Sequence, residues 1–139
     1  MDEQPILLVE DDEIDVMAVQ RLCRKGRVSN TLLHVSDGEA ALALLRGDDV
    51  PERPLRPLLV LLDLKMSPMG GIELLEALND EGSLPELPVV VLSGAKQPAE
   101  IARCQELGAR DYLQKPLTLE ELHRVTAKIG LKWTLGEEL

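Results

Sequence analysis

The stretch Leu58-Leu59-Val60-Leu61-Leu62-Asp63 decides the fold. Its five consecutive aliphatic residues predict a strand buried on both faces, because a half-exposed strand would alternate apolar and polar side chains. In open α/β sheets the ligand lies beyond the carboxyl ends of the strands. Asp63 is therefore a candidate site residue, although a carboxylate at this position can equally end the strand and cap a turn.

Strand and helix patterns alternate along the rest of the chain. The expected strands are residues 5–9, 31–35, 58–63, 89–92 and 111–114, and helical patterns cover residues 13–25, 38–46, 72–78, 98–107 and 118 onward. Ser36 with Glu39, and Thr118 with Glu121, have the spacing of a helix capping box. This order predicts an α/β fold, a five-stranded parallel sheet with helices on both faces.

Length and composition indicate one domain of 139 residues, with a core at 5–129 and a tail at 130–139. A formal net charge of −10 argues against nucleic-acid binding. Cys23 and Cys104 fall in apolar helical patterns without metal or disulfide spacing, which favours a reducing compartment. We find no signal peptide pattern and no apolar run of membrane-spanning length, so we expect a cytoplasmic protein without a membrane partner.

Four of the five expected strands end in polar residues: Glu10 and Asp11, Asp63, Ser93, and Lys115. In a parallel sheet these ends share one edge. Carboxylates gathered there repel one another, so the site needs a cation, and oxygen ligands favour Mg²⁺ over zinc. His34 and His123 are expected away from this edge, which also disfavours zinc. Together with Mg²⁺ these residues form a phosphoryl-binding set, in which Asp63 would be the nucleophile.

The same residues carry a resemblance to a known family. The receiver domain of bacterial response regulators is closely similar in Val9-Glu10-Asp11, Leu62-Asp63, Ser93-Gly94-Ala95 and Asp111-Tyr112-Leu113-Gln114-Lys115-Pro116. The resemblance covers roughly residues 5–129. It implies the flavodoxin-like strand order 2-1-3-4-5. It also implies that Asp63 accepts a phosphoryl group from a histidine kinase or a histidine phosphotransfer protein, in a phosphorelay and not as an enzyme.

The resemblance assigns a role to each matched residue. Glu10, Asp11, Asp63 and the backbone carbonyl of Lys65 would hold Mg²⁺. Ser93 would be the phosphate-sensing hydroxyl, Lys115 the phosphate-binding lysine and Tyr112 the aromatic switch residue. The Lys115–Pro116 bond would be cis, and Tyr112 could instead only fill the core. Asp12 is expected to be a helix N-terminal charge rather than a metal ligand.

A narrower resemblance concerns the stand-alone response regulators paired with bacterial phytochromes. It rests on residues 9–15, the loop at 47–57 and Lys132-Trp133. It implies a bacteriophytochrome as the kinase and output through the receiver surface or a homodimer. We expect Leu131, Trp133 and Leu135 to form a dimer arm, because large apolar side chains are costly in water.

Two alternatives remain from the sequence. One is a pseudo-receiver that binds a partner without phosphorylation. The other is a Mg²⁺-dependent phosphatase with an aspartyl-phosphate intermediate. The phosphatase is disfavoured by Lys65, which stands where such enzymes carry a second acid.

Overall fold

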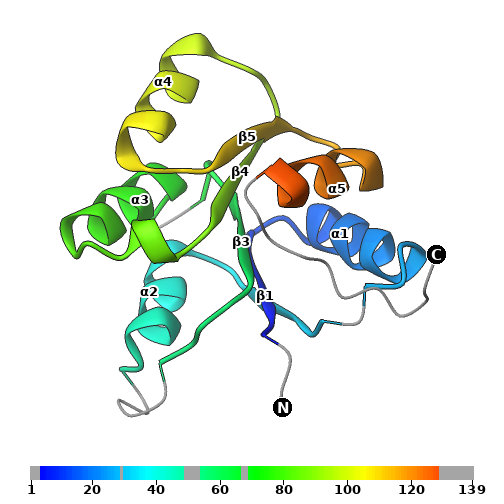
Figure 1. Ribbon diagram of the computed structural model, residues 1–139, viewed down its shortest axis with the longest axis horizontal. Helices are drawn as coiled ribbons and strands as arrows, with labels where there is room; N and C mark the ends of the chain where they lie inside the picture. Colours follow the sequence, from blue (N-terminus) through cyan, green and yellow to red (C-terminus); the bar gives the residue numbers. More distant parts are fainter. Residues whose placement is uncertain (1–3, 29, 49–53, 67–68, 129–139) are drawn as a thin grey trace.

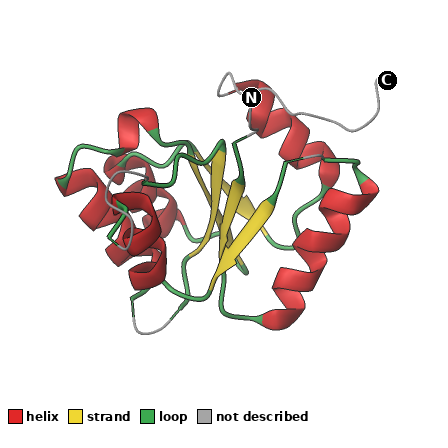
Figure 2. Cartoon of the chain, turned by 90° about the horizontal axis from the view of Figure 1, so that it is seen from below, coloured by secondary structure: helices red, strands yellow, loops and turns green. Residues whose placement is uncertain are grey.

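The computed structural model describes residues 4–28, 30–48, 54–66 and 69–128, and it shows a parallel sheet between two layers of helices (Figures 1 and 2). The strands run in the order β2-β1-β3-β4-β5, as the sequence predicts. The elements are β1 (Ile6–Val9), α1 (Glu13–Lys25), β2 (Leu32–Val35), α2 (Gly38–Arg46), β3 (Leu59–Asp63), α3 (Gly71–Asp80), a 3₁₀ turn (Leu84–Glu86), β4 (Val89–Ser93), α4 (Pro98–Leu107), β5 (Asp111–Gln114) and α5 (Leu119–Lys128).

The central strand is β3, with β1 and β4 as its parallel neighbours. Every residue of these three strands is buried, which is the reason for their unbroken aliphatic sequences. The more polar β2 lies at one edge and is only partly buried, also as the sequence predicts. Because β3 is covered on both faces, Asp63 at its end emerges from the middle of the sheet.

The side chains of the strands point alternately into two cores. One core joins the sheet to α2, α3 and α4, and the other joins it to α1 and α5. Figure 2 shows the sheet edge-on with these two helical layers on either side. Leu7, Val60 and Leu62 belong to the first core, and Leu8 and Leu61 to the second. This alternation along buried strands holds the strand ends, and so the site, in fixed positions.

Two helix starts differ from their sequence prediction. The predicted capping box of Ser36 and Glu39 is wrong, because Asp37 is the N-cap of α2 and accepts a hydrogen bond from the Ala40 N–H at 2.9 Å. Neighbouring Ser and Asp residues both suit an N-cap, and the backbone selects one. Helix α3 is longer than predicted at both ends.

The other capping prediction is confirmed. The Glu121 N–H donates to the Thr118 hydroxyl oxygen at 3.1 Å, and the Thr118 N–H donates to a Glu121 carboxylate oxygen at 3.2 Å. The expected dimer arm, with Leu131, Trp133 and Leu135, lies outside the described residues. Among the residues that the structure describes, no helix is both long and apolar enough to cross a membrane.

We predict that Gly71→Ala destabilises the fold by about 1–3 kcal/mol, because overpacking at this site would force the backbone to shift. A Cβ atom on Gly71 would lie 2.7 Å from the Asp63 carbonyl oxygen and 2.8 Å from the Leu64 Cα. Urea unfolding measures the change. Gly94→Ala is the matched control, since a Cβ there meets nothing within 4 Å. Equal free energies of unfolding for the two variants would contradict this reading of the loop.

Candidate functional site

The site lies at the carboxyl edge of the sheet, where the structure brings together the residues that end four strands. Glu10 follows β1, Asp63 ends β3, Ser93 ends β4 and Lys115 follows β5. Glu10, Asp63 and Ser93 are buried, with 1%, 5% and 3% of their surfaces exposed. Polar side chains this deeply buried need partners, because leaving them unpaired is costly.

Three carboxylates form the acidic part of the site. Glu10, Asp11 and Asp63 each place an oxygen so that all three atoms lie within 4.8 Å of one another. Within the described part of the chain, this is the one group of three or more His, Cys, Asp or Glu residues arranged to hold a metal ion. Asp11 is exposed, so the cluster opens to solvent on its side.

Lys115 supplies the positive charge between these carboxylates. Its Nζ lies 3.1 Å from Glu10 Oε1 and 3.2 Å from Asp63 Oδ1. It also lies 2.7 Å from Asp15 Oδ2 on α1, a contact that the sequence analysis did not identify. The Lys115–Pro116 peptide bond is cis, as the family resemblance implies. The lysine therefore joins the β5–α5 connection to β1, β3 and α1.

The environment raises the pKa values of both Glu10 and Lys115. Burial raises the pKa of Glu10 to about 7, and the nearby Asp63 carboxylate adds to this, while Lys115 opposes it. Burial alone would lower the pKa of Lys115, but hydrogen bonds to Asp15 and Glu10 and the charge of Asp63 outweigh burial, so its pKa is raised. The site therefore keeps its ammonium and has an excess of negative charge.

Ser93 and Tyr112 meet at one backbone carbonyl beside the acidic cluster. The Ser93 hydroxyl donates to the Ala95 carbonyl oxygen at 2.9 Å, and the Tyr112 hydroxyl lies 3.0 Å from the same oxygen. Tyr112 is buried, which raises the pKa of its hydroxyl. Glu100 of α4 lies 2.9 Å from this hydroxyl, so its single proton has two acceptors. Sequence reasoning missed Glu100, whose pairing depends on how α4 lies against β5.

His34 lies closer to the site than predicted. Its Nε2 lies 2.6 Å from the backbone carbonyl oxygen of Glu10, so the expectation that His34 is remote from the carboxyl edge was wrong. The sequence could have indicated this, because His34 is the penultimate residue of β2 and so lies near the carboxyl end of that strand. The contact is with the backbone, and His34 does not join the cluster of carboxylates.

The first turn of α1 also borders the site. Asp12 is the N-cap of α1, and its Oδ1 accepts hydrogen bonds from the Ile14 and Asp15 N–H groups at 2.8 and 3.4 Å. This confirms that Asp12 is a helix N-terminal charge. Lys65 is exposed beyond the end of β3. That its carbonyl is a metal ligand stays a prediction.

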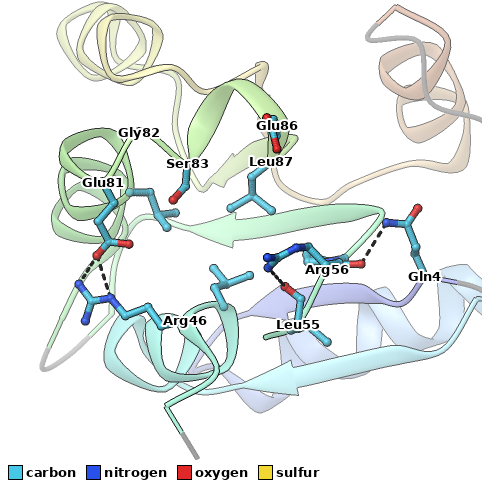
Figure 3. A pocket seen from close by; sticks show the side chains of 12 residues that line it. Gln4, Arg46, Leu55, Arg56, Glu81, Gly82, Ser83, Glu86 and Leu87 are labelled. Atoms are coloured by element: carbon cyan, nitrogen blue, oxygen red, sulfur yellow. Dashed lines mark hydrogen bonds and ion pairs between the residues drawn. The ribbon is translucent and has the colours of Figure 1, made fainter. Parts of the chain in front are cut away.

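A hollow of about 380 Å³ lies at the opposite edge of the sheet (Figure 3). It is lined by residues that precede β1, β3 and β4 and by the ends of α2 and α3. Its polar groups contact one another: Arg46 pairs with Glu81, and Gln4 donates to the Arg56 carbonyl oxygen at 3.1 Å. The cluster of acids thus lies at the edge that strand polarity predicts, and not in this hollow.

Comparison with known proteins agrees with the geometry. The model of the response regulator receiver domain matches residues 6–127. The chain belongs to this family. Receiver domains are signalling modules of two-component systems, in which they act with histidine kinases. The predicted family and the strand order 2-1-3-4-5 are therefore both confirmed.

The similar proteins are response regulators, and some of them are named as phytochrome response regulators. The chain is 33% identical to Response regulator Rcp1 of Synechocystis sp. over 92% of this chain and 87% of that protein. A structure of Mn²⁺-bound Rcp1 has a TM-score of 0.75 at 31% identity and covers 96% and 99% of the two chains. The structure of the bacteriophytochrome response regulator AtBRR has a TM-score of 0.85 at 30% identity, and the match covers 99% of this chain and 100% of AtBRR. The structure of the phosphorylated cyanobacterial phytochrome response regulator RcpA has a TM-score of 0.75 at 30% identity, and the match covers 97% of this chain and 99% of RcpA.

The acidic site fits a divalent cation on the evidence of its own residues. Two buried carboxylates and one exposed carboxylate converge, and within the described ranges Lys115 is the one ammonium found among them. Oxygen ligands of this kind suit Mg²⁺ or Mn²⁺. Burial, and after it the nearby Asp63 carboxylate, raise the pKa of Glu10, so its negative charge is costly here and a bound cation would lower that cost.

We predict that, in buffer with a chelator, stability falls as pH rises from about 4.5 to about 7. Over this range the folded state keeps the Glu10 proton and the unfolded state loses it, because the pKa rises from 4.5 to about 7 on folding. Glu10→Gln should remove up to about 3 kcal/mol of this decline. Urea unfolding at several pH values measures the free energy of unfolding of both proteins, and Glu86→Gln, at an exposed position, is the control. Parallel pH profiles for wild type and Glu10→Gln would contradict the predicted shift.

Proposed function

We propose that Asp63 accepts the phosphoryl group in this receiver domain, with Mg²⁺ as cofactor. The observation that supports it most directly is the position of the Asp63 carboxylate. Its Oδ1 lies 3.2 Å from the Lys115 ammonium, and Glu10 and Asp11 lie in the same cluster. We further propose a single receiver domain over residues 1–139 that acts in the cytoplasm through its own surface.

In the proposed reaction an Asp63 oxygen attacks the phosphorus atom of a phosphohistidine. The new P–O bond forms as the P–N bond breaks, and the imidazole leaves after it takes up a proton. Lys115 hydrogen-bonds a phosphoryl oxygen, and Ser93 donates to another once its hydroxyl turns away from Ala95. Mg²⁺ held by Glu10, Asp11, Asp63 and the Lys65 carbonyl would supply charge neutralisation at the same oxygens.

The proposed switch connects this chemistry to α4. Turning of Ser93 toward the phosphoryl group would leave the Ala95 carbonyl to Tyr112 alone. Tyr112 already lies inward, against Ala95 and Glu100, at the β5–α4 surface. A change at Asp63 would therefore alter the side of the domain formed by α4 and β5, which we propose as the output surface.

We propose a bacteriophytochrome as the histidine kinase partner. The support is similarity to AtBRR, which is named as a bacteriophytochrome response regulator, and to RcpA, which is named as a cyanobacterial phytochrome response regulator. Such a histidine kinase would present its phosphohistidine to Asp63 at the carboxyl edge of the sheet. A homodimer through Leu131, Trp133 and Leu135 remains a proposal from the sequence alone.

We predict that Asp63→Asn abolishes phosphorylation, because an amide is a far weaker nucleophile than a carboxylate. The assay incubates the chain with Mg²⁺ and acetyl phosphate and detects the added phosphoryl group by intact-protein mass. Asp80→Asn, the same change at an exposed position at the end of α3, should be phosphorylated as the wild type is.

Three outcomes of this assay separate the candidate functions. A slowly decaying adduct that is lost in Asp63→Asn supports the phosphoacceptor. The absence of any adduct on the wild type would favour the pseudo-receiver, and rapid multiple turnover of the phosphodonor would favour the phosphatase.

A further inference from the structure

We infer that Asp15 is a positioning residue that holds the Lys115 ammonium in place for phosphoryl transfer to Asp63. This inference rests on the proposed function. It assigns to α1 a part in the reaction, although Asp15 is neither the phosphoacceptor nor a member of the acidic cluster formed by Glu10, Asp11 and Asp63.

The contact between Asp15 and Lys115 is the shortest of the three ion pairs that the ammonium makes with described residues. Asp15 Oδ2 lies 2.7 Å from Lys115 Nζ, against 3.1 Å for Glu10 Oε1 and 3.2 Å for Asp63 Oδ1. Hydrogen bonds between charged groups at this length are about twice as strong as neutral ones. The Lys115 and Asp15 side chains are 20% and 34% exposed, so solvent screens the pair only in part.

An ammonium group has three N–H donors, and here three carboxylates surround it. When Asp63 is phosphorylated, the donor that faced Asp63 is the one that can turn to a phosphoryl oxygen. Glu10 and Asp15 then hold the other two. Asp15 thus fixes the end of a lysine side chain that is otherwise flexible, with four carbons and freely rotating donors.

The first turn of α1 places Asp15 at this point. Asp12 caps the helix and accepts hydrogen bonds from the N–H groups of Ile14 and Asp15, which fixes where the helix begins. The carboxylate of Asp15 lies in the first turn of α1, at the positive end of the helix dipole. Glu13 belongs to the same turn and is exposed, so it offers a matched position that carries the same charge.

The test compares Asp15→Asn with Glu13→Gln in phosphorylation by acetyl phosphate at saturating Mg²⁺. Both variants lose one negative charge from the first turn of α1, so a general electrostatic effect changes both alike. Asp15→Asn should lower the maximal rate by about three- to tenfold relative to Glu13→Gln, because Lys115 loses a charged partner that orients it. The Mg²⁺ concentration at half-maximal rate should be the same in the two variants, because Asp15 is not in the acidic cluster.

Two further variants exclude a merely structural role. Asp15→Glu keeps the charge within reach of Lys115 and should recover most of the lost rate. In a Lys115→Gln background, Asp15→Asn should cause no additional loss, because the group that Asp15 positions is gone. A full additional loss in that background would overturn the inference.

The remaining outcomes are equally decisive. Equal maximal rates for Asp15→Asn and Glu13→Gln, or a faster Asp15→Asn, would overturn the role of Asp15 while wild-type phosphorylation leaves the proposed function intact. A wild-type chain that gains no phosphoryl group would overturn the proposed function, and the inference with it.

Discussion

The site depends on the ion pairs that the Lys115 ammonium makes with Glu10 and Asp63. Glu10 and Asp63 are almost fully buried and lie close enough to repel each other, and burying such charges without a partner is costly. Lys115 lies within 3.2 Å of both and keeps its proton, since its pKa is raised. One ammonium does not balance these acids together with Asp11 and Asp15. Burial and the neighbouring Asp63 carboxylate raise the pKa of Glu10, and the remaining negative charge makes the edge a place for a divalent cation.

The sheet produces this concentration of charge through its topology. Parallel strands all end at one edge, so the polar residues that terminate β1, β3 and β4 meet although they are far apart in the sequence. The buried strands hold Glu10, Asp63 and Ser93 on rigid backbone. Lys115 lies just beyond β5, and its long side chain has more freedom than the others. Its carboxylate partners therefore decide where the charge is placed.

Much of this could be predicted from the sequence because it follows from the backbone pattern. The uninterrupted aliphatic runs place Asp63 and Ser93 at the ends of buried strands, and parallel pairing brings those ends together. The pairing of Asp15 with Lys115 could not be predicted in this way, since the two are 100 positions apart and meet only because α1 packs with a particular rotation. Glu100 and Tyr112 pair across α4 and β5 for the same kind of reason.

The central claim is that Glu10, Asp11 and Asp63 form one divalent-cation site at the carboxyl edge. A titration of the ¹⁵N-labelled chain with Mg²⁺, followed by backbone amide chemical shifts, tests it most directly. The account predicts saturable shifts that are largest at residues 10–12 and 63–65 and beside Lys115. Shifts without saturation, or the largest shifts at the opposite edge around Arg46 and Glu81, would contradict it.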